Sequence, residues 1–164
     1  MTNAAGQMTQ LMVVVNLKRL SKTFKETVPP SWAIGKSENG WMTNQTLYEN
    51  ITGVFYPWLV ERKIQFPIVL YLNGHVSHLT TLPLSKFCIE KRIELVALYP
   101  NSTHFLQPMD VALFHPLKLD WKKQVYKWRI EHSGIRLFRD NFCPLLKVLD
   151  STVTEKALMN GFRT

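Results

Sequence analysis

Two polar side chains stand where predicted strands end and a predicted helix begins. Asn73 follows the apolar run 68–72, and Asp110 opens a helix that the apolar spacing predicts over about 109–131. Ligands gather at the carboxyl ends of parallel strands in open α/β sheets. Asp110 lies four residues before Phe114 on the apolar stripe, so its carboxylate is expected to point at the sheet, towards Asn73. The alternative interpretation of Asp110 is a helix cap, which the helix dipole favours.

Histidines flank the same predicted edge. His75, His78 and His104 lie in the loops there, and Cys88 would be a fourth ligand of a zinc ion. Their spacing matches no structural zinc site, and histidines that hydrogen-bond the backbone are the favoured interpretation.

Basic residues are densest on the helix predicted over about 109–131. Most of them lie off the apolar stripe, and they are Lys118, Lys122, Lys123, Lys127 and Arg129. This cluster could contact phosphates electrostatically. The competing interpretation is a solvated helix face. The formal net charge of +8 and the pI of about 9.6 favour polyanionic partners without identifying one.

The elements that position these residues alternate between strand and helix. Residues 68–72 and 93–98 are apolar without alternation, which predicts parallel strands buried on both faces. Pro83 begins the helix between them, so the three form a βαβ unit with a right-handed crossover. The other predictions are a strand at 11–15, a loop up to 28–30, an irregular stretch at 32–41, a helix from Thr43 or Asn44 to about 61, and an amphipathic stretch at 137–149.

Length and composition set further bounds. A chain of 164 residues that is 46% hydrophobic fits one folded domain with an ordinary core. The apolar runs are far shorter than the roughly 20 residues that span a bilayer, and no signal peptide is visible, so no membrane association is expected. The two cysteines are expected to be reduced.

Three ordered blocks resemble one protein family. Residues 71–78 (YLNGHVSH) resemble the block in which Asp-Gly-His-x-Ser-His ends a strand of the DDE endonuclease domain in pogo, Tigger and Jerky-type transposases. Residues 98–110 (LYPNSTHFLQPMD) resemble the block whose Leu-Gln-Pro-Leu-Asp carries the last acid. Residues 34–42 resemble a supporting block, and residues 3–6 and 161–163 also fit.

The resemblance implies a fold and a chemistry. The implied fold is α/β and ribonuclease-H-like, with a mixed sheet flanked by helices. Members of this family cut DNA with divalent metal, usually Mg²⁺, held by three acids. One ion activates the attacking oxygen and the other stabilises the leaving oxygen.

This sequence departs from the family pattern at the acids. Asp110 matches the third acid, and Asn73 occupies the position of the second acid as a neutral amide. No residue matches the first acid, because residues 1–164 resemble a partial domain, cut at both ends, that lacks the first strand and most of the second. One carboxylate in place of three should bind Mg²⁺ weakly, through Asp110 if at all, and we expect no bound cofactor.

Three hypotheses about function follow. The first is a transposase-derived, catalytically inactive protein that binds DNA without sequence specificity through the basic cluster. The second is a fragment of an active metal-dependent endonuclease or transposase whose first acid lies in a longer parent chain. The third is the product of a relic gene without a selected role. The family and the charge imply a nuclear location, and a protein partner or a second copy is expected to cover the exposed sheet edge.

Overall fold

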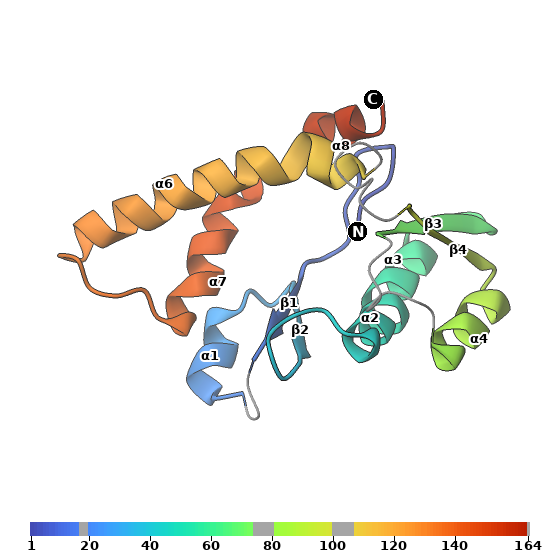
Figure 1. Cartoon of the computed structure of the whole chain (residues 1–164), viewed down its shortest axis with the longest axis horizontal. Helices are drawn as coiled ribbons and strands as arrows, with labels where there is room; N and C mark the ends of the chain where they lie inside the picture. The colour runs from blue at the N-terminus through green and yellow to red at the C-terminus, as the bar shows by residue number, and fades with distance from the viewer. Residues whose placement is uncertain (17–19, 74–80, 100–106, 164) are drawn as a thin grey trace. The chain divides into compact units, whose positions relative to one another are not determined.

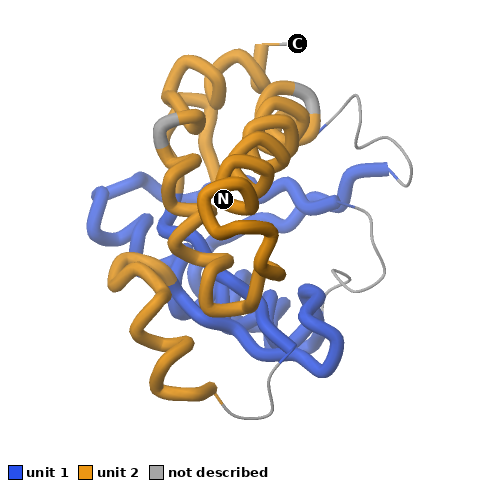
Figure 2. Tube along the Cα trace, turned by 90° about the vertical axis from the view of Figure 1, so that its left-hand side faces the viewer, with its two compact units in different colours: residues 1, 9–18, 33–107 blue, residues 2–8, 19–32, 108–164 orange. Residues whose placement is uncertain are grey.

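The computed structural model describes residues 1–16, 20–73, 81–99 and 107–163 (Figure 1). They divide into two compact units (Figure 2). The first unit contains residues 1, 9–18 and 33–107, and the second contains residues 2–8, 19–32 and 108–164. That residues 1–164 are one partial domain stays a prediction.

The first unit contains two small parallel sheets. Strand β1 (Met12–Val15) pairs with β2 (Ala33–Lys36), and β3 (Ile68–Leu72) pairs with β4 (Ile93–Ala97). Helix α4 (Leu82–Glu90) lies between β3 and β4 in the chain. The predicted βαβ unit and the α/β class are therefore confirmed for the described residues.

Two predictions for the first third of the chain are wrong. The stretch predicted as irregular contains β2, because the Ala33 N–H donates to the Leu11 carbonyl at 2.7 Å across a non-local pairing. The predicted loop contains helix α1 (Lys22–Thr27) in the second unit. Ser21 caps α1 by accepting a hydrogen bond from the Phe24 N–H at 3.1 Å, and the Phe24 side chain is buried.

The predicted burial of β3 on both faces is also wrong. Leu70 is buried, whereas Val69 and Tyr71 on the opposite face are 48% and 58% exposed. Among the described residues, the core of the first unit lies on the Leu70 side of this sheet. It is formed by Leu47, Ile51, Phe55, Leu59, Leu70, Leu84, Cys88 and Ile93. Helices thus cover one face of this sheet among the described residues.

The helix predicted to end near residue 61 is present in three parts. These are α2 (Asn44–Asn50), the π-helical turn η1 (Ile51–Phe55) and α3 (Tyr56–Glu61). Thr43 caps it, since the Thr46 N–H donates to Thr43 Oγ1 at 3.2 Å. The wide turn η1 ends two residues before Pro57, whose ring removes one backbone donor and clashes with the carbonyl four residues earlier.

The second unit contains the long helix. A π-helical turn η3 (Asp110–Phe114) leads into α6 (His115–Glu131), which agrees with the helix predicted over 109–131. As at η1, a proline, Pro116, follows the wide turn. The chain continues through α7 (Arg139–Val148), the 3₁₀ turn η4 (Leu149–Thr152) and α8 (Glu155–Gly161).

Helix α8 packs closely against the start of the long helical segment at η3. A Cβ added to Gly161 of α8 would clash with the Pro108 carbonyl and lie 3.1 Å from the Ala112 Cβ. Farther along, the rings of Trp121 on α6 and Phe142 on α7 meet edge to face, with 5.2 Å between centroids. Glycine at position 161 therefore allows α8 to pack against η3. None of the described helices combines the length and apolar character needed to cross a bilayer.

Candidate functional site

Asn73 and Asp110 lie at the element ends that the sequence predicts. Asn73 directly follows β3 in the first unit and is half-buried. Asp110 is the first residue of η3 in the second unit, also half-buried, and lies in the first turn of the helix. The two residues belong to different units, so their predicted juxtaposition stays a prediction.

The histidines of the zinc hypothesis lie outside the described residues, because 74–80 and 100–106 are not described. Cys88 is described, and its thiol is buried in the core of the first unit, 2% exposed. Burial raises the pKa of this thiol, which makes it a poor thiolate donor. Within the described ranges, no group of three or more His, Cys, Asp or Glu side chains is placed to hold a metal ion.

The structure divides the five predicted basic residues of α6 into two sets. All five are exposed. Lys123 lies 3.0 Å from the Asp120 carboxylate and Lys127 lies 3.8 Å from that of Glu131. The hydrogen bond from Lys123 lowers the pKa of the Asp120 carboxyl, so this ion pair persists to lower pH than an ordinary aspartate would allow.

The other three, Lys118, Lys122 and Arg129, have no carboxylate within 4.0 Å among the described residues. An α-helix turns by about 100° per residue, which places these three within roughly 40° of one another around α6. Lys123 and Lys127 lie about 100° or more further round from Lys122. We call the side that carries the three unpaired cations the basic face.

Aromatic side chains line a hollow on the basic face. A cavity of about 270 Å³ is lined by Trp121, Lys122, Val125, Tyr126 and Arg129. Tyr126 is 68% exposed. Sequence reasoning placed Trp121 and Val125 on the apolar stripe and missed Tyr126. The available signal was its position four residues after Lys122, which puts the ring and the ammonium group side by side.

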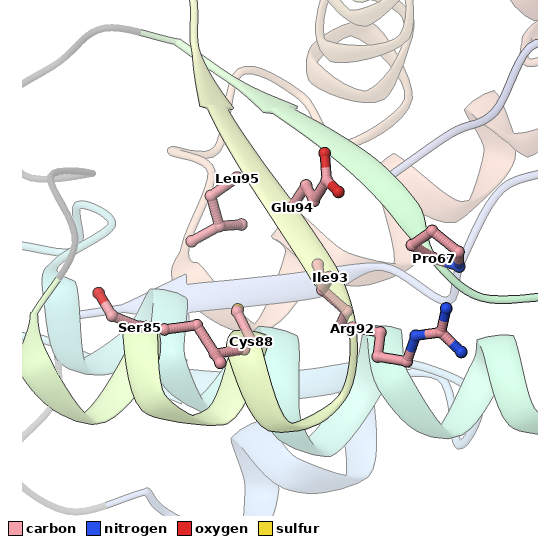
Figure 3. A pocket seen from close by; sticks show the side chains of 8 residues that line it. Pro67, Ser85, Cys88, Arg92, Ile93, Glu94 and Leu95 are labelled. Atoms are coloured by element: carbon pink, nitrogen blue, oxygen red, sulfur yellow. The ribbon is translucent and has the colours of Figure 1, made fainter.

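A second cavity lies between α4 and β4 in the first unit (Figure 3). It encloses about 570 Å³ and is lined by Pro67, Ser85, Cys88, Ile89, Arg92, Ile93, Glu94 and Leu95. Its two charged side chains, Arg92 and Glu94, are exposed at the rim, and its only thiol is the buried Cys88. These lining residues include no activated nucleophile and no paired acid and base.

Comparison with individual proteins finds a relative that this chain matches over part of that relative's length. A protein from Cochliobolus lunatus named MFS-type transporter clz9 is 29% identical to this chain over 163 residues. The similarity covers 98% of this chain but 17% of that protein. No solved structure matches the chain significantly.

The comparison with protein families identifies a family. The model described as DDE superfamily endonuclease matches residues 1–152. The matched region contains Asn73, Asp110 and the whole of the basic face. The structure is compatible with this match, because helices and small parallel sheets make up the described residues. The chain therefore belongs to the DDE superfamily endonuclease family.

Proposed function

We propose that this chain is a transposase-derived DDE domain of the pogo, Tigger and Jerky type, with a ribonuclease-H-like fold, that binds DNA and does not cut it. The observation that carries the proposal is the neutral amide of Asn73 at the position that resembles the family's second acid. Family membership supports the transposase origin. The basic face supports the binding of DNA.

The loss of cutting follows from the ligands that the chain offers. DDE endonucleases typically use divalent metal ions, and Mg²⁺ prefers charged carboxylate oxygens. Of the positions that resemble the acids, Asp110 supplies one carboxylate and Asn73 supplies an uncharged amide oxygen. This set does not fit a pair of divalent ions. Each missing transition-state contact of this kind costs about 3–4 kcal/mol, so the cutting rate should fall by several orders of magnitude.

A nicking assay tests the loss of cutting. Supercoiled plasmid is incubated with the chain in Mg²⁺ and separately in Mn²⁺, and the Asp110→Ala variant serves as the control for a contaminating nuclease. We expect equal, background levels of nicked circles from both proteins. Cleavage that disappears in Asp110→Ala would establish instead the alternative function, a fragment of a metal-dependent endonuclease or transposase whose first acid lies in a longer parent chain.

The binding of DNA follows from the charge of the basic face. Three cations that have no carboxylate partner among the described residues lie along one side of α6. They can replace counterions on the phosphates without first breaking an ion pair. Lys123 and Lys127 must give up part of their interaction with Asp120 and Glu131 to do the same. Contacts to phosphates carry no sequence information, so the binding should be non-specific.

A salt series tests this interface. The affinity for duplex DNA is measured by fluorescence anisotropy, and the slope of log K against log salt is compared among variants. Replacing Lys118, Lys122 and Arg129 with Gln should make the slope shallower by about 2.7, or 0.9 for each phosphate contact. The matched control is Lys123→Gln with Lys127→Gln, which should change the slope less per residue removed. Undetectable binding of the unmodified chain at low salt would refute the proposal.

A nuclear location is the corresponding cellular proposal, supported by the transposase-type family and by the net charge of +8. A fluorescent fusion of the chain should concentrate in the nucleus. Replacement of the three cations of the basic face should reduce its retention there, because non-specific binding of DNA holds it in place.

A further inference from the structure

We infer that the basic face takes unpaired nucleotides, with Tyr126 as the surface on which a base stacks and with Lys122 and Arg129 beside the backbone phosphates. This inference rests on the proposed binding of DNA and adds the class of nucleic acid, which is single-stranded. Its basis is the cavity that Tyr126 shares with Trp121, Lys122 and Arg129.

One aromatic ring of the cavity is held in place by a neighbour, and the other is exposed to solvent. Trp121 is half-buried and meets Phe142 edge to face, which fixes the orientation of the indole. Tyr126 has no such ring partner among the described residues and is 68% exposed. Val125 lies between them in the cavity wall. The hollow therefore combines a fixed indole and an apolar side chain with one largely exposed ring, that of Tyr126.

The charged side chains that line the hollow are both positive. Lys122 and Arg129 line it, Lys118 lies one helical turn before Lys122, and no acidic residue contributes to the lining. From Lys118 to Arg129 the helix rises by roughly 16 Å at about 1.5 Å per residue. The three cations are therefore spread along the helix, where they can meet successive phosphates of one strand. The cations can thus follow a short backbone segment while a base reaches the tyrosine.

An exposed ring between cations favours single strands over duplexes. In a duplex the ring faces of the bases are covered by their neighbours, and a protein reaches only base edges and phosphates. Unpaired bases expose their faces, and proteins bind them by combining a positively charged groove with aromatic stacking. The cations of the basic face serve either form of DNA, whereas Tyr126 adds affinity only for the unpaired form.

The test measures the affinities of the unmodified chain and of Tyr126 variants for single-stranded and for duplex DNA. Anisotropy is measured with a labelled oligothymidine of about ten nucleotides and with a labelled duplex. Tyr126→Leu should weaken binding of oligothymidine by about 5-fold to 100-fold, as the loss of one stacked base does, and should leave duplex binding within about twofold. Tyr126→Phe should retain binding, because the ring is kept. Tyr71→Leu, at an exposed tyrosine on β3, is the matched control and should change neither affinity.

The outcomes separate this inference from the function on which it rests. Duplex binding that persists while Tyr126→Leu leaves the oligothymidine affinity unchanged overturns the stacking role and retains the DNA-binding function. Absence of binding to both probes overturns both. Polyglutamate that displaces oligothymidine at equal charge concentration overturns the recognition of bases, since it would show a site for acidic chains. Circular dichroism of each variant confirms that it is folded.

Discussion

Two leucines on α4 lie two residues apart and have opposite surroundings. Leu84 is 1% exposed in the core of the first unit, whereas Leu82 is 68% exposed. We expect Leu84→Ala to lower the free energy of unfolding by about 2–5 kcal/mol, through lost burial and a residual cavity. Leu82→Ala should stay within about 0.5 kcal/mol of the unmodified chain. Urea denaturation measures both changes, and equal effects would contradict the assignment of the core.

The sequence identifies the cations of α6 but does not show which of them surround the aromatic hollow. Helical spacing alone places Asp120 three residues before Lys123 and Glu131 four residues after Lys127, so the two ion pairs can be anticipated. That the three remaining cations surround an aromatic hollow requires the positions of side chains. For Asp110, the helical phase gives a direction only, because the distance to Asn73 depends on tertiary packing.

At the scale of elements, two glycines test the packing of helices. Gly161→Ala should destabilise the chain, because the new Cβ meets the Pro108 backbone, which has little freedom to move. Gly53→Ala is the matched control, since nothing lies within 4 Å of the added Cβ on η1. It should be neutral or stabilising by up to about 1 kcal/mol, because alanine loses less conformational entropy. Thermal unfolding followed by circular dichroism measures both, and a harmless Gly161→Ala would mean that α8 does not pack on η3.

Elements with local signals could be predicted, and those with non-local causes could not. Strand β3, helix α4 and strand β4 follow from apolar runs and one proline, and Thr43 marks the start of α2. Strand β2 has only four residues and depends on its pairing with β1, which no local pattern reveals. The exposed face of β3 was missed because an apolar strand does not report how many layers cover it.

At the scale of the whole molecule, stability should fall at alkaline pH. Cys88 and Cys143 are buried, one in each unit, and burial raises the pKa of both thiols above the ordinary value of 9.0. The unfolded chain loses these protons at the ordinary value while the folded chain keeps them. The contribution to stability is therefore complete below pH 9.0 and is lost as the pH rises through the raised pKa.

The measurement is the urea midpoint between about pH 8 and about pH 10.5, for the unmodified chain and for the Cys88→Ala, Cys143→Ala variant. The variant should be less stable at about pH 8 and should lose less stability as the pH rises. Lysine and tyrosine titrations occur in both proteins, so the difference between the two curves isolates the thiols. Parallel curves would show that the thiols ionise alike in the folded and unfolded states.

Helix α6 has seventeen residues and none of them is buried. Core packing, the main source of helix stability in proteins, therefore contributes little here. The helix depends on its ion pairs, on the hydrogen bond from the His132 N–H to the Trp128 carbonyl at its C-terminal end, and on the contact at Trp121. Its amide hydrogens should exchange with solvent deuterium earlier than those around Ile51 and Leu84. A nucleic acid bound along the helix would slow that exchange, so the protection of α6 amides would report occupancy directly, without any label on the DNA.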